Sequence, residues 1–475
     1  MLRSVVNSFD IFDTLIARRG IWPTAIPEEL ERAFSAQGFS QARRACEHRL
    51  ASAGKAFRLS DIYQTMVAER TLTTDDARLL FEAEVLAEFD HAVPIVENLS
   101  QVSAGDLLVS DMYLPRDMLR RLLHHVGLRL PVTIVVSNHG KHHGDIWASL
   151  SKGWLIKQHL GDNPHSDVEM PRRHGIHGVL CTQARLTPVE QLVLESGYPV
   201  LAQVMRTCRL GNPLPSTSVA TEVWNAACQF NLPLLVLGAA GLRRQRDALG
   251  LRRILFSDRD CYLLAEIFSL LHPADDIDYI HVSREVLQHG SKDFLAYLDE
   301  VGLDDALICD IAATGCSWEH FARAQRRKLA LFTFVFIDNW REATFPASEI
   351  LASPWLQCVW IRRSSELINY STAIEVVNTA PYPSCRRVTR TGNQFSAEFH
   401  SSRELPEEVL QAVIGAHGAA MDLLRKHRFA LVAELARPAT KDLCGQLINA
   451  LSATSQLNSL GALLKWPPNS GRTTI

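Results

Sequence analysis

The sequence lacks paired cysteines and Cys/His clusters. Its ten cysteines are scattered singly between Cys46 and Cys444, with no Cys-x-x-Cys pair and no Cys/His group at zinc spacing. This pattern argues against a disulfide framework and a zinc site, and it favours a reduced, cytoplasmic protein. An excess of one charge is also missing, because 49 Lys and Arg are interspersed with 52 Asp and Glu. We therefore expect no nucleic-acid partner.

Long apolar runs are missing as well. The most apolar window, LPLLVLGAAGL at 232–242, has 11 residues, whereas a membrane-spanning helix needs about 20. The window predicts a buried helix, and the first residues, MLRSVVNSFDIFD, have no apolar core of a signal peptide. We expect no transmembrane segment, although the helical pattern from 404 onward leaves peripheral membrane contact open.

The first half of the chain alternates between strand and helix patterns. Apolar runs at 5–9, 106–114, 131–138 and 175–182 predict strands, and residues 24–105 carry apolar residues at helical spacing. Such alternation predicts a parallel α/β sheet, whose ligands bind at the carboxyl ends of the strands. With about 100 to 200 residues per domain, 475 residues predict two or three domains.

A Pro-, Gly- and Ser-rich stretch, RLGNPLPSTSV at 209–219, predicts a linker between residues 1–208 and a second α/β region at 220–403. Strand patterns in that second region include RRILFSD, DDALICDIAATG and LALFTFVFID. Residues 404–475 carry a helical pattern that ends in a polar tail. The expected fold is thus two parallel-sheet α/β domains followed by C-terminal helices.

Polar residues suited to phosphoryl transfer follow the predicted strands of the first region. They are Asp10 with Thr14, Ser110, Lys141, and the pair Asp162 and Asp167 in GDNPHSD. A nucleophilic carboxylate, a phosphoryl-binding hydroxyl, a charge-balancing lysine and Mg²⁺-binding acids together form such a site. Singly, each could instead be a helix cap, a loop residue or a turn residue.

In this order of motifs, residues 1–205 resemble the haloacid-dehalogenase-like (HAD) hydrolase superfamily, most of whose members are Mg²⁺-dependent phosphatases. The resemblance implies a Rossmann-like domain with a helical cap at about 19–104. It also implies that Asp10 is the nucleophile, Ser110 binds the phosphoryl group and Lys141 neutralises charge. The metal positions that it implies are Asp10, Phe12, Asp162 and Asp167.

Phe12 departs from the pattern of that superfamily, whose phosphatases usually carry an acid–base aspartate two positions after the nucleophile. Asp13 stands one position further on, where glycine is usual. The stretch FDIFDTL is similar to members from bacterial surface-polysaccharide gene clusters. Asp13, Glu28 or Glu29 are the candidates for the missing acid, whose contribution is typically about 10²- to 10⁴-fold in rate.

The second region carries a small-residue loop after a strand, in ALICDIAATGCSW at 306–318. Backbone N–H groups and a hydroxyl at a helix N-terminus suit a phosphate. The stretch resembles the phosphoribosyl-pyrophosphate loop of type I phosphoribosyltransferases, across about residues 250–345. Residues that match or flank its binding motifs are Asp310, Thr314, Gly315, Ser317, Arg259, Asp260 and Arg284. Alternatively, the stretch is a plain strand-to-helix turn, and Arg259 and Arg284 are ordinary surface residues.

Together the resemblances imply a bifunctional enzyme that moves ribose 5-phosphate from phosphoribosyl pyrophosphate to a glycan acceptor, possibly lipid-linked, and then removes the 5-phosphate. Mg²⁺ would serve both steps. One alternative is a stand-alone Mg²⁺-dependent phosphatase on a sugar phosphate or nucleotide, with a substrate-binding second domain. A non-catalytic scaffold is the other alternative, motivated by Phe12.

Overall fold

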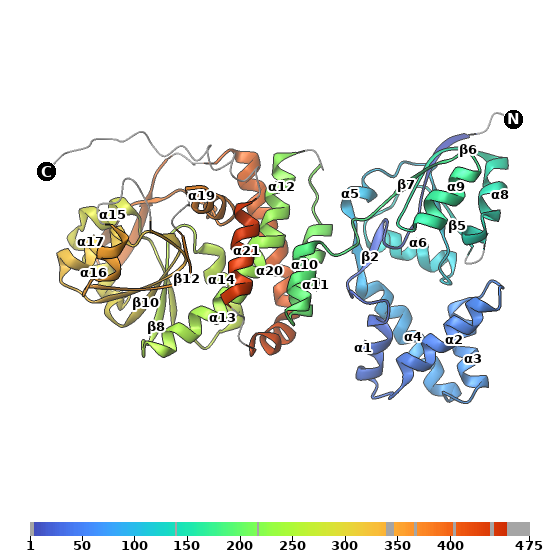
Figure 1. Ribbon diagram of the computed structural model, residues 1–475, viewed down its shortest axis with the longest axis horizontal. Coiled ribbons are helices and arrows are strands. Elements are labelled where there is room, and N and C mark those ends of the chain that lie inside the picture. The colour runs from blue at the N-terminus through green and yellow to red at the C-terminus, as the bar shows by residue number, and fades with distance from the viewer. Residues whose placement is uncertain are drawn as a thin grey trace. The chain divides into compact units, whose positions relative to one another are not determined.

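The computed structural model describes residues 4–453, except 138–139, 216–217, 339–345, 365–367, 402–404 and 438–440. The chain divides into two compact units (Figure 1). Unit 1 comprises Met1–Thr187 with Leu210–Pro213, and unit 2 comprises Pro188–Arg209 with Leu214–Ile475. Each unit contains one five-stranded parallel sheet, so the predicted α/β class is confirmed.

The sheet of unit 1 has the order β5-β4-β1-β6-β7, with all neighbours parallel. Its strands are β1 (Ser4–Phe9), β4 (Leu107–Ser110), β5 (Thr133–Val136), β6 (Trp154–Gly161) and β7 (His177–Leu180). Buried side chains cover both faces: Leu108 packs in one apolar cluster, whereas Leu107 and Val109 pack in another. The strand order changes direction between β1 and β6, which is where such sheets bind ligands.

A helical insert lies between β2 (Ile16–Arg18) and β3 (Ala92–Pro94), which pair antiparallel. It contains α1 (Ala25–Ala33), α2 (Phe39–Ser52), α3 (Leu59–Ala68) and α4 (Thr74–His91), in agreement with the helical periodicity (Figure 1). The remaining helices of unit 1 are α5 (Val96–Leu99), α6 (Arg116–His125), α7 (Gly140–His143), α8 (Asp145–Gly153), the π-helix η1 (Pro164–Glu169) and α9 (Met170–Arg173).

The sheet of unit 2 has the order β12-β11-β10-β8-β9, also parallel throughout. Its strands are β8 (Arg253–Ser257), β9 (Ile277–Ile280), β10 (Ala306–Ala313), β11 (Leu329–Ile337) and β12 (Leu356–Ser364). Every residue of β11 is buried, as expected for a strand covered on both faces. Here the order changes direction between β8 and β10.

Helices that follow the strands of unit 2 are α14 (Tyr262–Leu271), α15 (Arg284–His289), α16 (Lys292–Glu300), the 3-10 helix η3 (Leu303–Asp305), α17 (Cys316–Gln325) and α18 (Ala347–Leu351). A hairpin of β13 (Cys385–Thr391) and β14 (Gln394–Phe399) was not predicted from the sequence. Its β13 side chains Cys385 and Val388 are buried with Phe294 of α16.

The remaining helices of unit 2 are α10 (Pro188–Glu195), α11 (Pro199–Leu210), α12 (Val219–Ala226), the π-helix η2 (Ala227–Asn231), α13 (Leu232–Ala248), α19 (Ile368–Val377), α20 (Glu407–Leu435) and α21 (Lys441–Ser452). The sequence suggested a linker at 209–219; the compact units divide after Thr187, and Leu210–Pro213, within that stretch, belong to unit 1. The physical reason lies in α10 and α11: Glu190 is fully buried against Arg209, and Val200 N donates to Glu434 of α20 at 2.7 Å.

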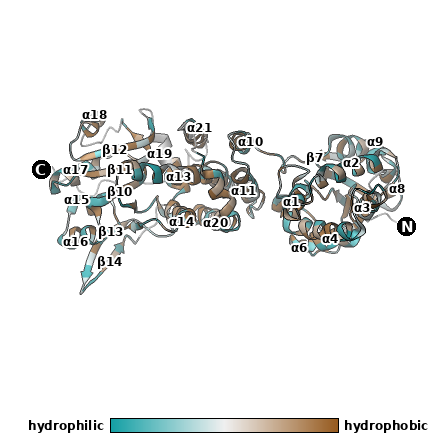
Figure 2. Ribbon diagram, turned by 90° about the horizontal axis from the view of Figure 1, so that it is seen from below, coloured by the Kyte–Doolittle hydropathy of each residue, from teal (hydrophilic) through white to brown (hydrophobic). Residues whose placement is uncertain are grey.

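The apolar window at 232–242 lies in α13, within a continuous helical stretch from Val219 to Ala248. By length and composition this is the one candidate membrane span among the described residues, and 78% of its most apolar window is buried inside the chain. Its apolar residues are brown in Figure 2. Such burial is typical of a core helix, as the sequence predicted.

Candidate active site

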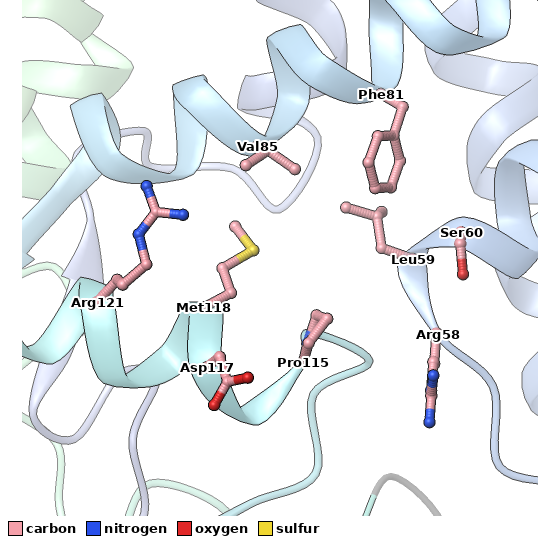
Figure 3. Close-up of a pocket in the computed structure, with 9 residues that line it drawn as sticks. All are labelled: Arg58, Leu59, Ser60, Phe81, Val85, Pro115, Asp117, Met118 and Arg121. Atoms are coloured by element: carbon pink, nitrogen blue, oxygen red, sulfur yellow. The ribbon is translucent and has the colours of Figure 1, made fainter.

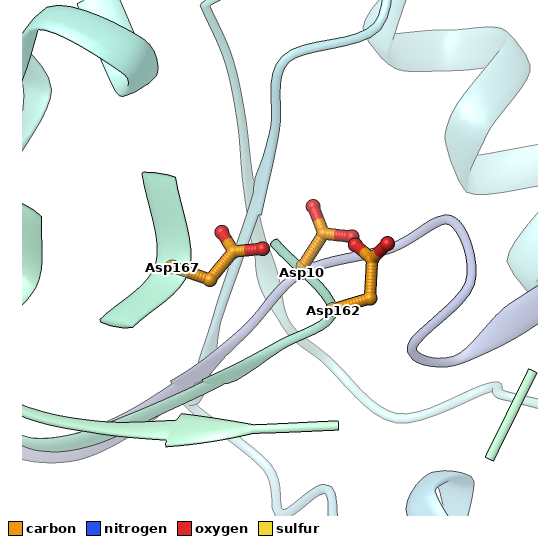
Figure 4. A group of neighbouring side chains, drawn as sticks. All are labelled: Asp10, Asp162 and Asp167. Atoms are coloured by element: carbon orange, nitrogen blue, oxygen red, sulfur yellow. The ribbon is translucent and has the colours of Figure 1, made fainter. Parts of the chain in front are cut away.

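Three aspartates meet at the β1/β6 switch point of unit 1. Asp10 directly follows β1, Asp162 directly follows β6, and Asp167 lies in η1. Carboxylate oxygens of the three lie within 4.8 Å of one another (Figure 4). The parallel register explains why, since Phe9 pairs with Leu160 and the two strands end together.

Lys141 bridges two of these aspartates. Its Nζ donates to Asp10 Oδ1 and lies 2.7 Å from Asp167 Oδ1, and all three side chains are at most 6% exposed. Burial raises the pKa of Asp10 well above its usual value, although the charge of Lys141 acts in the opposite direction. Burial also opposes the charge of Lys141, but Asp10 and Asp167 raise the pKa of its ammonium group above the usual range.

Asp167 is held by two further groups. His159 Nε2 lies 3.2 Å from Asp167 Oδ1, and Asn163 N donates to Oδ2 at 2.9 Å. Burial opposes ionisation of Asp167, but the hydrogen bond from His159 and the charge of Lys141 hold its pKa well below the usual value. Gly161 makes room for this carboxylate, because a Cβ there would lie 2.3 Å from Asp167 Cγ.

The aspartate group suits a hard divalent cation. Three carboxylates face one lysine, so the ionised group carries an excess of negative charge. Burial, followed by the charges of Asp13 and Asp167, raises the pKa of Asp162 to about 6. Carboxylate oxygens that lie within 4.8 Å of one another can bind one Mg²⁺ ion, which prefers carboxylates and retains several waters. Asp10, Asp162 and Asp167 are therefore the residues that could hold it.

Ser110 lies at the carboxyl end of β4, next to β1, and is 1% exposed. Its Oγ accepts a hydrogen bond from Met112 N at 3.3 Å, so the local chain fixes the hydroxyl. Asp13 adopts a left-handed backbone (φ 54°), and its N–H donates to Ile16 O at 2.7 Å. Thus Ser110 and Asp13 both occur at the sheet edge that carries the aspartates.

The Phe12 side chain is mostly buried and offers no oxygen ligand. The guanidinium of Arg18 lies 4.4 Å from the centre of its ring. Glu88 of α4 accepts two hydrogen bonds from Arg18, at 2.9 and 2.8 Å. At position 12, an aromatic ring thus contacts Arg18, whose guanidinium is paired with Glu88 of the insert.

The two candidate acids of the insert have local partners. Glu28 accepts a hydrogen bond from Thr24 at 2.6 Å, and Glu29 pairs with His91 at 2.8 Å. The hydrogen bond with His91 lowers the pKa of Glu29, so this group is a poorer proton donor than an ordinary glutamate. Asp13 remains the candidate that lies near Asp162.

A hollow in unit 1 lies apart from the aspartate group. It has a volume of about 190 Å³ and lies between the insert and α6 (Figure 3). Its lining residues are Arg58, Leu59, Ser60, Phe81, Val85, Pro115, Asp117, Met118 and Arg121. None of them belongs to the predicted site, so the hollow marks the boundary between insert and sheet rather than the aspartate group.

In unit 2, Asp310 in β10 faces the loop that follows β8. The register explains this, since Cys309 pairs with Phe256 and the loop 258–260 begins just beyond. Burial, followed by the charge of Asp260, raises the pKa of Asp310 to about 7, while Arg259 acts in the opposite direction. Arg259 Nε lies 3.3 Å from Asp260 Oδ1. The structure therefore brings Asp310, Asp260 and Arg259 to the β8/β10 switch point.

The small-residue loop after β10 leads directly into α17. Thr314 Oγ1 accepts a hydrogen bond from Cys316 N at 3.2 Å, and Ser317 lies in the first turn. Gly315 adopts a left-handed backbone (φ 76°), and a Cβ there would lie 3.1 Å from Ile350. Arg284 is an exposed residue at the start of α15, after β9.

Sequence reasoning missed His159, which orients Asp167, and Asp258, which pairs with residues of β9. His159 precedes the GDN motif within an apolar strand, so a strand assignment through Gly161 would have placed it next to Asp167. Asp258 directly precedes Arg259 and Asp260, and this position in the predicted binding loop could have indicated a role for it.

No family model matches this sequence, and no curated protein is a significant match.

Proposed function

We propose that the chain is a bifunctional enzyme. Unit 2, as a phosphoribosyltransferase-like domain, transfers ribose 5-phosphate from phosphoribosyl pyrophosphate to a glycan acceptor. Unit 1, as a HAD-like phosphatase whose insert is the cap, then removes the 5-phosphate, which gives a ribofuranosylated surface polysaccharide. The ten free cysteines suit a cytoplasmic location for both steps.

One observation carries the phosphatase half: the buried Lys141 ammonium bridges Asp10 and Asp167, with Asp162 beside them. In this proposal an Asp10 oxygen attacks phosphorus, an O–P bond forms, and the ester P–O bond breaks with its electron pair on the leaving oxygen. Water then hydrolyses the aspartyl-phosphate. Mg²⁺, when bound by Asp10, Asp162 and Asp167, would neutralise charge on the transferring group.

The remaining residues of unit 1 have roles that follow from their positions. Lys141 fixes the orientation of the Asp10 carboxylate and offsets the charge of the phosphoryl group. Ser110 supplies a fixed hydroxyl at the same edge, and Asp13 is the candidate that gives a proton to the leaving oxygen. His159 keeps the Asp167 carboxylate in place.

The transferase half is supported by Asp310, Asp260 and Arg259 at the β8/β10 switch point. The acids would bind ribose hydroxyls, and Arg259 would contact the diphosphate. Thr314, Gly315 and Ser317 would cradle the 5-phosphate at the start of α17. Arg284, at the start of α15, is the second diphosphate candidate.

Asp10→Asn tests the proposal against its alternatives. The full chain is incubated with phosphoribosyl pyrophosphate, Mg²⁺ and glycan acceptors, and diphosphate and orthophosphate are measured separately. Wild type should release both in an acceptor-dependent manner. Asp10→Asn should keep diphosphate release, lose orthophosphate release by at least about 1,000-fold and accumulate a phosphorylated ribosyl product.

Asp145→Asn, at an exposed aspartate of α8, is the matched control and should behave as wild type. Orthophosphate from generic phosphomonoesters without acceptor-dependent diphosphate would favour the stand-alone phosphatase. A scaffold would release neither product, and Asp10→Asn would leave its function in polysaccharide assembly unchanged.

A further inference from the structure

A group of rings surrounds the loop 258–260 of unit 2, at the edge that carries the proposed transferase site. We call it the ring cluster, and its members are Tyr262, Tyr279, His281, Tyr382 and Phe399. They come from α14, from β9 and the residue just after it, from the segment before β13, and from the end of β14. Segments that are distant in sequence thus converge on one side of Asp258.

Asp258 is buried and incompletely paired. Its side chain is 1% exposed, and its Oδ1 accepts a hydrogen bond from the Tyr279 hydroxyl at 2.8 Å. Its Oδ2 has no hydrogen-bond partner among the described residues and lies 3.5 Å from His281 Nδ1. Burial, followed by the charge of Asp258, raises the pKa of Tyr279 well above its usual value, so the phenol remains a donor. A buried carboxylate with one open oxygen is costly unless a function requires it.

The His281 ring presents one nitrogen to Asp258 and leaves the imidazole partly accessible, since its side chain is 32% exposed. Three rings pack against it edge-on: Tyr279 at 5.7 Å, Tyr382 at 6.2 Å and Phe399 at 5.3 Å between centres. The 3.5 Å between Asp258 Oδ2 and His281 Nδ1 is an ion-pair contact rather than a hydrogen bond, and Nδ1 has no hydrogen-bond partner among the described residues. A shortening of this contact when a ligand binds would let Asp258 accept from Nδ1–H and leave Nε2 as the proton acceptor, which is the arrangement of an Asp–His general base.

Tyr382 and Phe399 extend this arrangement into a surface. Their ring centres are 5.0 Å apart, and Phe399, the last residue of β14, is 37% exposed. Aromatic rings that present one apolar face beside a polar group suit a ring-shaped ligand with both C–H faces and hydroxyl groups. A sugar has this chemistry.

We propose that Asp258 and His281 form the general-base pair for transfer in unit 2, and that Tyr382 and Phe399 bind the sugar ring that carries the accepting hydroxyl. The inference deepens the proposed function and rests on it, because it assigns the acceptor side of the reaction. His281 acts on the acceptor directly, whereas Asp258 acts through His281 and is a positioning residue.

The step balances without a further reactant. The acceptor oxygen forms a bond to C1 of the ribose, and the C1–O bond to diphosphate breaks, with its electron pair leaving on diphosphate. The hydroxyl proton passes to His281 Nε2, and Asp258 stabilises the resulting imidazolium. Asp310 and Arg259 remain on the donor side.

The test uses the full chain with phosphoribosyl pyrophosphate, MgCl₂ and a panel of methyl hexosides and methyl hexosaminides, and it follows diphosphate release. His281→Gln should lower kcat by at least about 100-fold, with KM for phosphoribosyl pyrophosphate changed by less than about twofold. Asp258→Asn should lower kcat by at least about 10-fold. His289→Gln, at an exposed histidine of α15, is the matched control and should be unchanged.

The pH profile separates a base from a structural histidine. Groups facing His281 are Asp258, Tyr279 and Tyr382, together with Tyr297, whose hydroxyl accepts from the His281 backbone N–H at 3.2 Å. Wild type should lose kcat at acid pH, where an imidazole base is protonated, and His281→Gln should not show that acid limb. Equal kcat in His281→Gln and wild type would overturn the proposal.

If no methyl glycoside supports diphosphate release, that result counts against the proposed transferase. A binding measurement then tests the sugar site separately. With ¹³C-labelled histidine, the His281 signal is identified by its loss in His281→Gln, and methyl glycosides are titrated in. A shifted His281 signal would retain the sugar site and discard the transfer step. An unmoved signal, with the same His281 titration in wild type and Asp258→Asn, would overturn the inference. Thermal melts of each variant establish that it folds.

Discussion

At the scale of single residues, the charge balance of the aspartate group has a consequence for stability. Lys141 offsets part of the charge of Asp10, Asp162 and Asp167, and the rest is repulsion at a buried edge. A divalent cation that binds only the folded chain should therefore stabilise it.

The first prediction is that Mg²⁺ raises the melting temperature of the wild-type chain. At a concentration about 100 times Kd, the free energy of unfolding should rise by about 2.7 kcal/mol. Asp162→Asn should abolish most of this shift, because it removes a ligand, whereas Asp145→Asn should keep it. A differential scanning fluorimetry titration measures both, and an equal shift in Asp162→Asn would argue against the assigned ligands.

The close approach at Gly161 gives the second prediction. Gly161→Ala places a Cβ 2.3 Å from Asp167 Cγ, so the carboxylate must leave its contacts with Lys141 and His159. We expect at least about 100-fold lower phosphomonoesterase activity. Gly153→Ala, where no atom lies within 4 Å of the added Cβ, is the matched control. Full activity in Gly161→Ala would show that the position of Asp167 is not critical.

Much of the aspartate group's position follows from the sequence, because parallel strands end at one edge of a sheet. Asp10 and Asp162 follow strands directly; the chain pattern predicted the strand before Asp10, whereas β6 before Asp162 was expected only as a short apolar segment that leads into a loop. The support of Asp167 was not predictable in the same way. His159 reaches it from inside β6, and Gly161 makes room for it, so both roles depend on packing between β6 and η1.

At the scale of elements, the insert is tied to the sheet domain by buried charge. Arg43 of α2 makes a two-point contact with Glu84 of α4, and its NH2 also donates to the Tyr113 hydroxyl at 2.9 Å. Tyr63 donates to Glu84 at 2.5 Å. Tyr113 lies three residues after Ser110, so this network connects the insert to the loop of the proposed phosphoryl-binding hydroxyl.

The third prediction follows from that burial. Arg43→Met leaves Glu84 buried without its cation and should cost about 3 to 5 kcal/mol in the free energy of unfolding. Arg49→Met, in the same helix, removes the exposed pair with Glu69 and a hydrogen bond to Cys46 Sγ, and it should cost about 1 kcal/mol or less. Urea denaturation compares the two. Similar costs would mean that the buried pair contributes no more than a surface one.

The β13–β14 hairpin is an element that the sequence pattern did not predict. Its strands carry many charged residues and alternate weakly, and its turn reads Gly392-Asn393 rather than the usual Asn-Gly. The hairpin is stabilised by contacts with α16, including Arg390 N donating to Asp293 at 3.1 Å. Such a partner can be identified only when the whole sheet is in place.

At the scale of the whole molecule, the proposed function assigns a separate reaction to each unit, which gives the fourth prediction. Asp310→Asn should lower acceptor-dependent diphosphate release by at least about 100-fold, because it removes a charge at the β8/β10 switch point. Orthophosphate release from p-nitrophenyl phosphate should stay at the wild-type level. Asp304→Asn, at an exposed aspartate in the same strand connection, is the control. Loss of both activities would argue that the units do not act independently.

The division after Thr187 was not predictable from composition, although Leu210–Pro213, within the predicted linker, belong to unit 1. Residues 209–219 are rich in Pro, Gly and Ser, which indicates a chain without regular structure but not which helices pack together. The partners of α10 and α11 are decided by tertiary contacts, such as that of Val200 with Glu434 more than 200 residues later.

The pairing of β2 with β3 has a consequence for how this architecture could be altered. Ile16 pairs with Pro94 and Arg18 with Ala92, so the chain leaves the sheet domain and returns to it at one point. A segment whose two ends are fastened side by side can be exchanged for another without moving its surroundings. The helices between β2 and β3 could therefore be exchanged for other helices while the sheet of unit 1 keeps its structure. Such exchanges would adapt one aspartate group to substrates of different size.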